Sequence, residues 1–565
     1  SKYIMSKNIE LNLEQKIAFK TIDTFLKHRP EKILVLEGYA GTGKSTVISH
    51  IFNLPEYSKM SVCMSATTNK AVNVLKKMGK ETNKKIDYLT IHKLLKIKRT
   101  IDSDGKQHFI TSFNETTDSR NKKCKSIFSY NIIVIDEASM VDDIMYKNIS
   151  RISQQIQGKI IFVGDRNQLP PVNQTISEVF KIDKNSIIRL KQIVRSKADN
   201  NIVHISNYIR EAIYNSDNLK LKQFRDDHVM ISREQKKWLN IYTKLLIEKG
   251  REEKSVILAY TNNKCQIINN FVRNILFSVE QTKNKFVPGE HIVFNNYYQT
   301  DNNKYYTSQN EIIKEISTSD YTTPSLDLQD IINLKNNLNG DTSKKTITKD
   351  RDSDEESNGD EEFLCQLCKE EEVDETCVTV CDHKLCIECI KGWITKHKCC
   401  PLCLTETRDD ELVVKEYDKL NVIIDKIKHL LKNLSFSVYS IKLFNNDIVY
   451  ALTETGKQQY SVLDEKLKGL MYEFKTEILK SKKIINFGLV LLSRIWLFVF
   501  NNVIDAFADI NYGYCITAHK SQGSTYDNVF VDVSNILNFN RREIDGLKCL
   551  YTSVTRAANK LHLFY

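Results

Sequence analysis

Short runs of consecutive apolar residues, separated by longer amphipathic stretches, dominate the first 200 residues of the chain. Such runs are typical of parallel strands that helices cover on both faces. A second block with the same pattern begins near Ser255 and resumes near Asn511. Both blocks predict α/β domains. In the first block we expect strands at Ile33–Leu36, Ser61–Ser65, Ile132–Ile135 and Lys159–Val163.

The long detour between the two blocks has a different pattern. Alternating polar and apolar residues predict short strands at His291–Phe294, Glu311–Ile316, Phe436–Leu443 and Ile448–Glu454. A charged helix is expected around Leu412–Leu431. Residues 336–362 are polar, and eight of the thirteen residues from Asp350 to Glu362 are acidic, so we expect a solvated linker there.

Two further segments stand out by their pattern. Leu95–Ile110 alternates around Asp104-Gly105, which predicts a β-hairpin. Phe487–Phe500 is apolar over fourteen residues but carries Arg494. A membrane span needs about twenty apolar residues, so we expect a buried or amphipathic helix, with membrane contact as the minor alternative.

Length and composition limit the class of protein. The 565 residues predict three or more domains, and 27% charged with 41% hydrophobic residues suit a globular protein with real cores. The net charge of +11 is consistent with a polyanionic partner. Nine of the fourteen cysteines lie in Cys365–Cys403, which favours metal ligation in a reducing compartment over disulfides. The first ten residues lack the apolar core of a signal peptide, so we expect an intracellular protein, in the nucleus or cytoplasm.

The segment GYAGTGKS, from Gly38 to Ser45, follows one expected strand and opens a helix. Glycines there let successive backbone N–H groups point at phosphates, and the helix N-terminus adds positive potential. Lys44 can reach the β- and γ-phosphates, and the Ser45 hydroxyl can bind Mg²⁺. A glycine-rich turn with a chance Lys-Ser is the alternative. The pattern therefore predicts a site for a nucleoside triphosphate.

The apolar strand at 132–135 ends in two acids, Asp136 and Glu137. A carboxylate at the tip of such a strand can hold Mg²⁺, a role that we assign to Asp136. Glu137 can accept a proton from the attacking water. A pair of acids that merely caps a strand is the alternative, but the phosphate loop favours hydrolysis.

Further short motifs follow one another along the chain: Leu13-Glu14-Gln15, Ala66–Ala71, Thr90-Ile91-His92, Gly164–Val172, Leu190–Ser196, Thr261-Asn262, Thr517–Ser524 and Leu550–Arg556. With these segments in this order, the chain resembles a superfamily 1B helicase of the RecD/Dda-like group over nearly its whole length outside about 320–435. The resemblance implies that Gln15 reads adenine and that Gln168 senses the γ-phosphate, which Arg195 and Arg556 also contact. The remaining nucleotide-binding residues are then Gly38, Gly41, Thr42, Gly43, Lys44, Ser45, Thr46 and Gly523.

The same resemblance implies contacts with single-stranded DNA. Hydroxyl and amide side chains suit phosphate positioning without sequence readout. The expected DNA contacts are Thr67, Asn69, Lys70, His92, Asn262, Thr517, His519 and Ser521. The hairpin occupies the place of a small β-wedge in relatives, where Phe109 or His108 would stack on the last base pair. A surface hairpin with a buried Phe109 is the alternative.

The cysteine cluster has the spacing of two tetrahedral zinc sites. The order of its ligands resembles a RING finger, which implies two Zn²⁺ ions in a closed, structural arrangement. By that resemblance one ion is bound by Cys365, Cys368, Cys386 and Cys389, and the other by Cys381, His383, Cys400 and Cys403. Cys377 and Cys399 are assigned to neither ion, and either could replace a neighbouring ligand. A structural knuckle that only stabilises a loop is the alternative function.

RING fingers commonly recruit a ubiquitin-conjugating enzyme through an apolar residue in the first cysteine pair and a tryptophan after the sixth ligand. Leu367 and Trp393 match these positions, and Pro401 matches the usual proline beside the groove. Leu404 departs from the basic residue that many active ligases carry after the last ligand. We therefore expect binding of a conjugating enzyme more than efficient transfer of ubiquitin.

Together these patterns predict an α/β fold with two RecA-like domains, a hairpin wedge, an SH3-like accessory domain and an inserted RING finger. We expect an ATP-dependent, monomeric DNA helicase that moves 5′ to 3′. An RNA helicase, a RING ligase or adaptor carried by a helicase-like ATPase, and a nucleotide-gated scaffold remain as alternatives. The Lys-, Asn- and Ile-rich composition suggests an AT-rich genome, and the RING insertion in a helicase of this kind suggests a large DNA virus and its replication compartment. We expect the first RecA-like domain at 1–200, with the hairpin at 91–115, and the second at 201–288 with 505–565. The SH3-like accessory domain is expected at 289–335 with 434–480. The remaining segments are the linker 336–362, the RING finger 363–406, and helices at 407–433 and 481–504.

Overall fold

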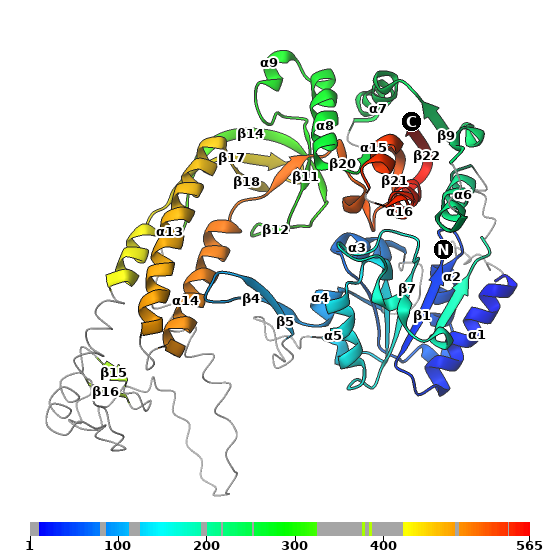
Figure 1. The fold of residues 1–565 in the computed structure, drawn as a ribbon, viewed down its shortest axis with the longest axis horizontal. Helices are drawn as coiled ribbons and strands as arrows, with labels where there is room; N and C mark the ends of the chain where they lie inside the picture. Colours follow the sequence, from blue (N-terminus) through cyan, green and yellow to red (C-terminus); the bar gives the residue numbers. More distant parts are fainter. Residues whose placement is uncertain are drawn as a thin grey trace, which may run out of the picture.

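The computed structural model describes residues 11–78, 86–111, 125–193, 201–215, 219–250, 254–324, 376–378, 384–386, 422–480, 485–540 and 542–565. Two parallel sheets with their helices lie one above the other, and an antiparallel sheet continues from the upper one (Figure 1). A pair of long helices descends from the antiparallel sheet, and a hairpin from the lower parallel sheet reaches this helix pair.

The lower body is a six-stranded parallel sheet in the order β3-β2-β6-β7-β1-β8. Its strands are β1 (Ile33–Gly38), β2 (Val62–Ala66), β3 (Ile86–Thr90), β6 (Ile132–Asp136), β7 (Lys159–Gly164) and β8 (Ile187–Leu190). The central strands are buried at nearly every position, which explains their continuous apolar sequence. The helices of this body include α1 (Leu13–His28), α2 (Lys44–Phe52), α3 (Asn69–Met78), α4 (Ile91–Leu94) and α5 (Asp143–Ser153). All four strands expected from the sequence in this block are present.

The upper body is a five-stranded parallel sheet in the order β20-β10-β21-β22-β9. Its strands are β9 (Val229–Ser232), β10 (Ser255–Ala259), β20 (Cys515–Thr517), β21 (Tyr526–Asp532) and β22 (Ala557–Phe564). The helices are α6 (Asn201–Asn215), α7 (Gln235–Lys249), α8 (Asn262–Leu276), α15 (Val533–Asn538) and α16 (Glu543–Val554). The two parallel sheets confirm the expected pair of RecA-like domains, the second of which is interrupted after α8.

The antiparallel sheet follows the order β18-β17-β14-β11-β19. Its strands are β11 (His291–Phe294), β14 (Asn310–Thr322), β17 (Ser435–Leu443), β18 (Ile448–Leu452) and β19 (Ile510–Tyr512). The short α9 (Val279–Thr282) and the pair β12 (Tyr298–Gln299) and β13 (Lys304–Tyr305) lie between α8 and β14. The Cys-rich segment is inserted between β14 and β17, where only β15 (Thr376–Val378) and β16 (Lys384–Cys386) are described before residue 422.

A helical arm extends from this sheet, and its length was not expected from the sequence. α13 (Glu454–Lys480) has 27 residues and packs along α14 (Ile485–Val499), which ends in a π-helical turn at Phe500–Ile504. The residues of α13 that are buried repeat at helical spacing, a signal that we overlooked. They are Gly456, Leu463, Leu467, Met471, Phe474 and Ile478.

The rest of the arm core comes from two apolar segments. α14 confirms the expected helix in the apolar run 487–500, with Leu492 and Ile495 fully buried. Of the charged helix expected at 412–431, residues 422–430 are described and helical, and their Ile423 and Ile427 join the same core. Among the described helices, none combines the length and apolar character that crossing a bilayer requires.

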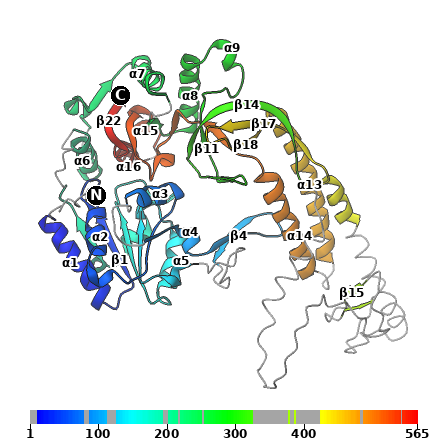
Figure 2. The same ribbon diagram turned by 180° about the vertical axis from the view of Figure 1, so that it is seen from behind.

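The expected hairpin consists of β4 (Ile97–Ile101) and β5 (Gln107–Thr111), joined by a turn in which Gly105 has a φ of +74°. Its tip docks on the arm (Figure 2). A Cβ at Gly105 would lie 3.0 Å from the Trp496 ring of α14. Arg99 of β4 donates to Asp505 Oδ2 at 2.5 Å and to Asn501 Oδ1 at 2.9 Å. The hairpin therefore bridges the first RecA-like domain and the arm.

Candidate nucleotide and nucleic-acid site

The loop between β1 and α2 has the geometry of a phosphate cradle. Gly41 and Gly43 have φ values of +80° and +77°, which L side chains rarely adopt. Lys44 opens α2, and its Nζ donates to the carbonyl oxygens of Gly38 at 2.6 Å and Tyr39 at 3.0 Å. The ammonium is thus held inside the loop, where it would meet the phosphates. These residues fit a nucleoside triphosphate.

Gln15 contacts this loop from α1. Its Oε1 accepts from the Asn12 backbone N–H at 3.0 Å in a capping box, and its Nε2 donates to Thr42 O at 3.0 Å. The side chain is 2% exposed. Both ends of the amide are therefore paired within the chain, and contact with adenine would require at least one of these bonds to exchange. The adenine-reading role stays a prediction.

The two acids after β6 take different positions. Asp136 Oδ1 accepts the backbone N–H of Glu137 at 2.8 Å, and Glu137 has a φ of +52°, so the chain turns sharply between them. Burial, together with the neighbouring Glu137 carboxylate, raises the pKa of Asp136 to about 6, and Lys44 opposes this shift. Asp136 and the exposed Ser45 would hold Mg²⁺, which supplies positive charge against the phosphates.

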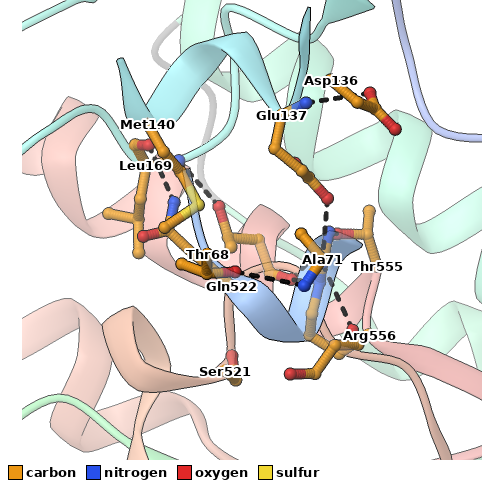
Figure 3. Close-up of polar contacts among 12 residues, drawn as sticks. Thr68, Ala71, Asp136, Glu137, Met140, Leu169, Ser521, Gln522, Thr555 and Arg556 are labelled. Carbon is orange, nitrogen blue, oxygen red and sulfur yellow. Dashed lines mark hydrogen bonds and ion pairs between the residues drawn. The ribbon is translucent and has the colours of Figure 1, made fainter. Parts of the chain in front are cut away.

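Glu137, Gln168 and Arg556 meet at the junction of the two RecA-like domains. Arg556 follows α16 of the second domain, and its Nη1 lies 3.8 Å from Glu137 Oε1 (Figure 3). With the Gln168 amide oriented to satisfy both partners, its Nε2 donates to Glu137 Oε2 at 3.2 Å. Its Oε1 then accepts from Arg556 Nη2 at 3.3 Å. Three residues predicted separately from sequence therefore form one cluster.

The loop after β7, which carries Gln168, is held from the second domain on both sides. The Leu169 backbone N–H donates to Thr552 Oγ1, and Gln522 Nε2 donates to Leu169 O, both at 2.9 Å. Tyr551 Oη donates to Asp165 Oδ2 at 2.6 Å. Sequence reasoning assigned no role to Asp165, Gln522, Tyr551 or Thr552, although all lie in segments that carry the resemblance. Their partners are too distant in sequence for a local pattern to reveal them.

Several predicted DNA contacts gather at the carboxyl ends of strands that face this junction. Thr67 follows β2, and Asn69 and Lys70 begin α3. Lys70 Nζ donates to Ser308 O at 3.2 Å and to Tyr526 Oη at 3.1 Å, so it links the first domain to the turn before β14 and to the first residue of β21. Thr67 Oγ1 lies 3.6 Å from Met140 Sδ, as a weak hydrogen bond.

The aromatic ring of Phe109 on the hairpin is accessible and lies beside His92 of α4. Phe109 is 61% exposed and its ring meets that of His92 edge-on, with centroids 6.3 Å apart. The alternative of a buried Phe109 is therefore wrong, because β5 turns this face to solvent while Ile101 of β4 enters the arm core. An exposed aromatic side chain on a held hairpin is free to stack on a base.

The predicted contacts of the second domain divide by exposure. Asn262 begins α8 and is exposed, and His519 is half-buried. Burial lowers the pKa of His519, so its imidazole is neutral near pH 7. Thr517 is 8% exposed, while Ser521 is fully buried and donates to Ala518 O at 2.7 Å. As placed, the Ser521 hydroxyl is occupied inside the turn, so its DNA contact remains a prediction.

Gly523 occupies the contact between the two domains. It has a φ of +70°, and a Cβ there would lie 3.1 Å from Ala71 Cβ of α3. It therefore serves close packing of the second domain on the first. Its assignment to the nucleotide remains a prediction, as do those of Thr42, which is buried, and Thr46, which is half-buried.

Other predicted site residues lie outside the part of the chain that the structure describes. These are Arg195, the conjugating-enzyme residues Leu367 and Trp393, and the zinc ligands Cys365, Cys368, Cys381, His383, Cys389, Cys400 and Cys403. Of Cys386 only the backbone, in β16, is described. Within the described residues, His, Cys, Asp and Glu side chains form no group of three or more that could hold a metal ion.

Comparison with known proteins agrees with this geometry. The family of AAA domains matches residues 10–228, that of UvrD-like helicase C-terminal domains matches 512–564, and that of C3HC4-type RING fingers matches 365–403. An uncharacterised protein of Acanthamoeba polyphaga mimivirus is 25% identical over 97% of this chain and 99% of its own length. The ATP-dependent RecD2 DNA helicase of Deinococcus radiodurans is 28% identical over 32% of this chain and 22% of its own length.

Two further similarities were found. The RecD subunit of the RecBCD enzyme of Buchnera aphidicola is 28% identical over 38% of this chain and 39% of its own length. The chain thus spans well under half of either RecD relative. The crystal structure of Pif1 helicase from Candida albicans aligns over 98% of this chain and 94% of its own, with 16% identity and a TM-score of 0.36.

The two RecA-like sheets, the junction cluster and the matched families define a helicase-type ATPase that acts on nucleic acid and uses ATP and Mg²⁺. These matches agree with the expected resemblance to the superfamily 1B helicases, and the RING finger match at residues 365–403 implies bound zinc.

Proposed function

We propose that this protein unwinds DNA by moving 5′ to 3′ along a single strand as it hydrolyses ATP. The observation that carries the proposal is the cluster of Glu137, Gln168 and Arg556 at the domain junction. An arginine from one domain that reaches the catalytic carboxylate of the other ties hydrolysis to the closure of the cleft between them.

The route from this cluster to DNA is short. The Gln168 loop is bonded to Gln522, which lies in the same segment as the predicted DNA contacts Thr517 and His519. A displacement of the loop when the γ-phosphate leaves would therefore reach residues that face the strand. We propose that Thr67, Asn69, Lys70, His92, Asn262, Thr517, His519 and Ser521 form this DNA track, with Phe109 at the point of strand separation.

Direction and polymer can be tested on one set of fluorescent duplexes. We expect unwinding of a DNA duplex with a 5′ single-stranded tail, little with a 3′ tail, and none with Lys44→Ala. Lys44 is the residue whose ammonium is held in the loop, so this variant separates ATP-driven opening from passive melting. Preference for the 3′ tail would contradict the proposed direction. Equal ATPase stimulation by RNA and DNA would favour an RNA helicase, and ATP hydrolysis without any displacement would favour a nucleotide-gated scaffold.

We further propose that the RING finger binds two Zn²⁺ ions and recruits a ubiquitin-conjugating enzyme. The family match over residues 365–403 favours this second function, together with Leu367 and Trp393 at the expected contact positions. Thiolate and imidazole ligands in closed tetrahedral sites give zinc a structural role. Metal analysis should find two zinc ions per chain, and one ion per chain would contradict the assignment.

Discharge of ubiquitin from a panel of charged conjugating enzymes tests the recruitment. We expect discharge that Trp393→Ala abolishes and Lys44→Ala preserves, because the contact and the ATPase are separate. Failure to discharge in the unaltered chain would leave the RING finger as a structural insert, in keeping with Leu404.

The full-length similarity to a mimivirus protein supports a viral context for this chain. We propose that it works as a monomer in the nucleus, the cytoplasm or a viral replication compartment. Localisation of a tagged chain relative to newly made viral DNA tests this directly. We also retain the expected boundaries as proposed domains, with the helical arm added to the SH3-like accessory part.

A further inference from the structure

A hydroxyl group from the second RecA-like domain lies against the nucleotide loop of the first. Tyr551 belongs to α16, and its Oη accepts a hydrogen bond from the backbone N–H of Ala40 at 3.3 Å. The same Oη donates to Asp165 Oδ2 at 2.6 Å. The side chain is 1% exposed. A single phenol therefore joins the loop after β1, the loop after β7 and the second domain.

Ala40 lies in the loop from Gly38 to Ser45, and successive backbone N–H groups of such a loop point at the phosphates of a bound nucleotide. The N–H of Ala40 is paired with the Tyr551 hydroxyl instead. We propose that Tyr551 is a positioning residue whose hydroxyl takes the place of a phosphate oxygen at Ala40 until nucleotide binds. Bound nucleotide then displaces it from Ala40, while its bond to Asp165 persists.

The surrounding contacts hold both partners of the hydroxyl in place. Asp165 is 2% exposed, and its other oxygen accepts the Asn167 backbone N–H at 2.9 Å, so the carboxylate is fixed. The Arg210 guanidinium lies 3.8 Å from the centroid of the Tyr39 ring, next to Ala40. The loop is therefore contacted by α6 and α16 together.

The replacement of the Tyr551 hydroxyl by a phosphate oxygen at Ala40 would also affect neighbouring contacts, because of where Tyr551 lies in the chain. It precedes Thr552, which accepts the Leu169 N–H, and it stands five residues before Arg556. Release of the hydroxyl from Ala40 would free the loop after β1 to shift relative to α16, which stays tied to the loop after β7 through Asp165 and Leu169. Nucleotide binding would in this way change the position of the nucleotide loop relative to the helix that precedes Arg556 before hydrolysis begins.

The test is the affinity of the full chain for Mg·ADP without DNA, measured by calorimetry. Tyr551→Phe removes one competing neutral hydrogen bond from the nucleotide-free state, so we expect the Kd to fall by about fivefold. The matched control is Tyr57→Phe, which removes another buried tyrosine–aspartate bond, from Tyr57 Oη to Asp23 Oδ1 at 2.5 Å, away from the loop. Its Kd should not change. A merely structural Tyr551 would leave affinity unchanged or weaker, and either result overturns the proposal.

A second measurement keeps the hydroxyl, in case the phenylalanine variant does not fold. With 3-fluorotyrosine at position 551, the ¹⁹F resonance should move when Mg·ADP saturates the chain, while the same label at position 57 should not respond. A stationary resonance at 551 overturns the exchange. The inference rests on nucleotide binding at residues 38–45 and not on DNA unwinding. Loss of unwinding alone leaves it standing, whereas an unaltered chain that does not bind Mg·ADP overturns both.

Discussion

Ile101→Ala should release the hairpin from the helical arm. Ile101 ends β4, is 6% exposed, and belongs to the same apolar core as Leu492, Ile495 and Trp496 of α14. The substitution removes three carbon atoms, which at about 0.8 kcal/mol each amounts to about 2.4 kcal/mol before any cavity is counted. This loss falls on the junction between two bodies, so docking should weaken by about fiftyfold.

The polar contacts of the same junction cannot compensate. The Arg99–Asp505 pair and the Lys475–Asp104 pair are partly exposed, with side-chain accessibilities between 26% and 52%. Ion pairs of this kind contribute about 0.2–1 kcal/mol each. The apolar contact of Ile101 and the packing of Gly105 on Trp496 therefore decide whether the hairpin stays docked.

Hydrogen exchange of residues 97–111 in the full chain measures how firmly the hairpin is docked. Unwinding of a forked duplex measures how much the docked hairpin contributes to strand separation. We expect faster exchange and slower unwinding for Ile101→Ala, with DNA-stimulated ATP hydrolysis retained. The control is Ile110→Ala on the same hairpin, because Ile110 is 50% exposed and should contribute little. If the two variants change exchange equally, or if neither does, the reasoning from burial is refuted.

Three other predictions concern single side chains at the site. Phe109→Ala should lower unwinding and spare both stability and ATP hydrolysis, because the ring is 61% exposed; equal unwinding by the variant would remove Phe109 from strand separation. Arg556→Lys should lower the kcat of DNA-stimulated hydrolysis by about 10³-fold with little change in ADP affinity, since a lysine cannot reach Glu137 and Gln168 together. A higher Kd for ADP with an unchanged kcat would contradict this. The raised pKa of Asp136, about 6, predicts that hydrolysis falls as pH drops through 6, and that its midpoint moves to lower pH with more Mg²⁺, which binds only the ionised carboxylate. Because of the same pKa shift, Asp136 should also lower the free energy of unfolding as pH rises from about 4 to about 6. If the fall of hydrolysis at acid pH did not depend on the Mg²⁺ concentration, the titrating group would be another residue.

Features encoded within a few residues could be predicted from the sequence. The phosphate loop needs only a strand, three glycines and a lysine in succession, and the acids after β6 need only their strand. Gln15 shows the limit of this reasoning. Its position beside the loop was expected, but its capping bond to Asn12 and its bond to Thr42 O depend on how α1 packs.

Contacts between distant segments could not be predicted in this way. Ala40 and Tyr551 are 511 residues apart, and Arg99 and Asp505 are 406 apart. No local pattern encodes such pairs, because they follow from how two separately folded bodies meet. The helix α13 is a different case, since its apolar spacing was present in the sequence and a longer window would have revealed it.

The place where the RING segment leaves the motor bears on how such a chain could arise. Thr322 pairs with Ser435 in neighbouring antiparallel strands, and the Thr323 backbone N–H donates to Leu434 O at 2.9 Å. The two ends of the insertion are therefore as close as the ends of a tight turn. A gene segment for a module could therefore enter at this point without changing the register of β14 and β17, while Ile423 and Ile427 near its end pack into the arm core. A helicase built in this way can carry a different inserted domain on its accessory sheet while its ATPase domains stay the same.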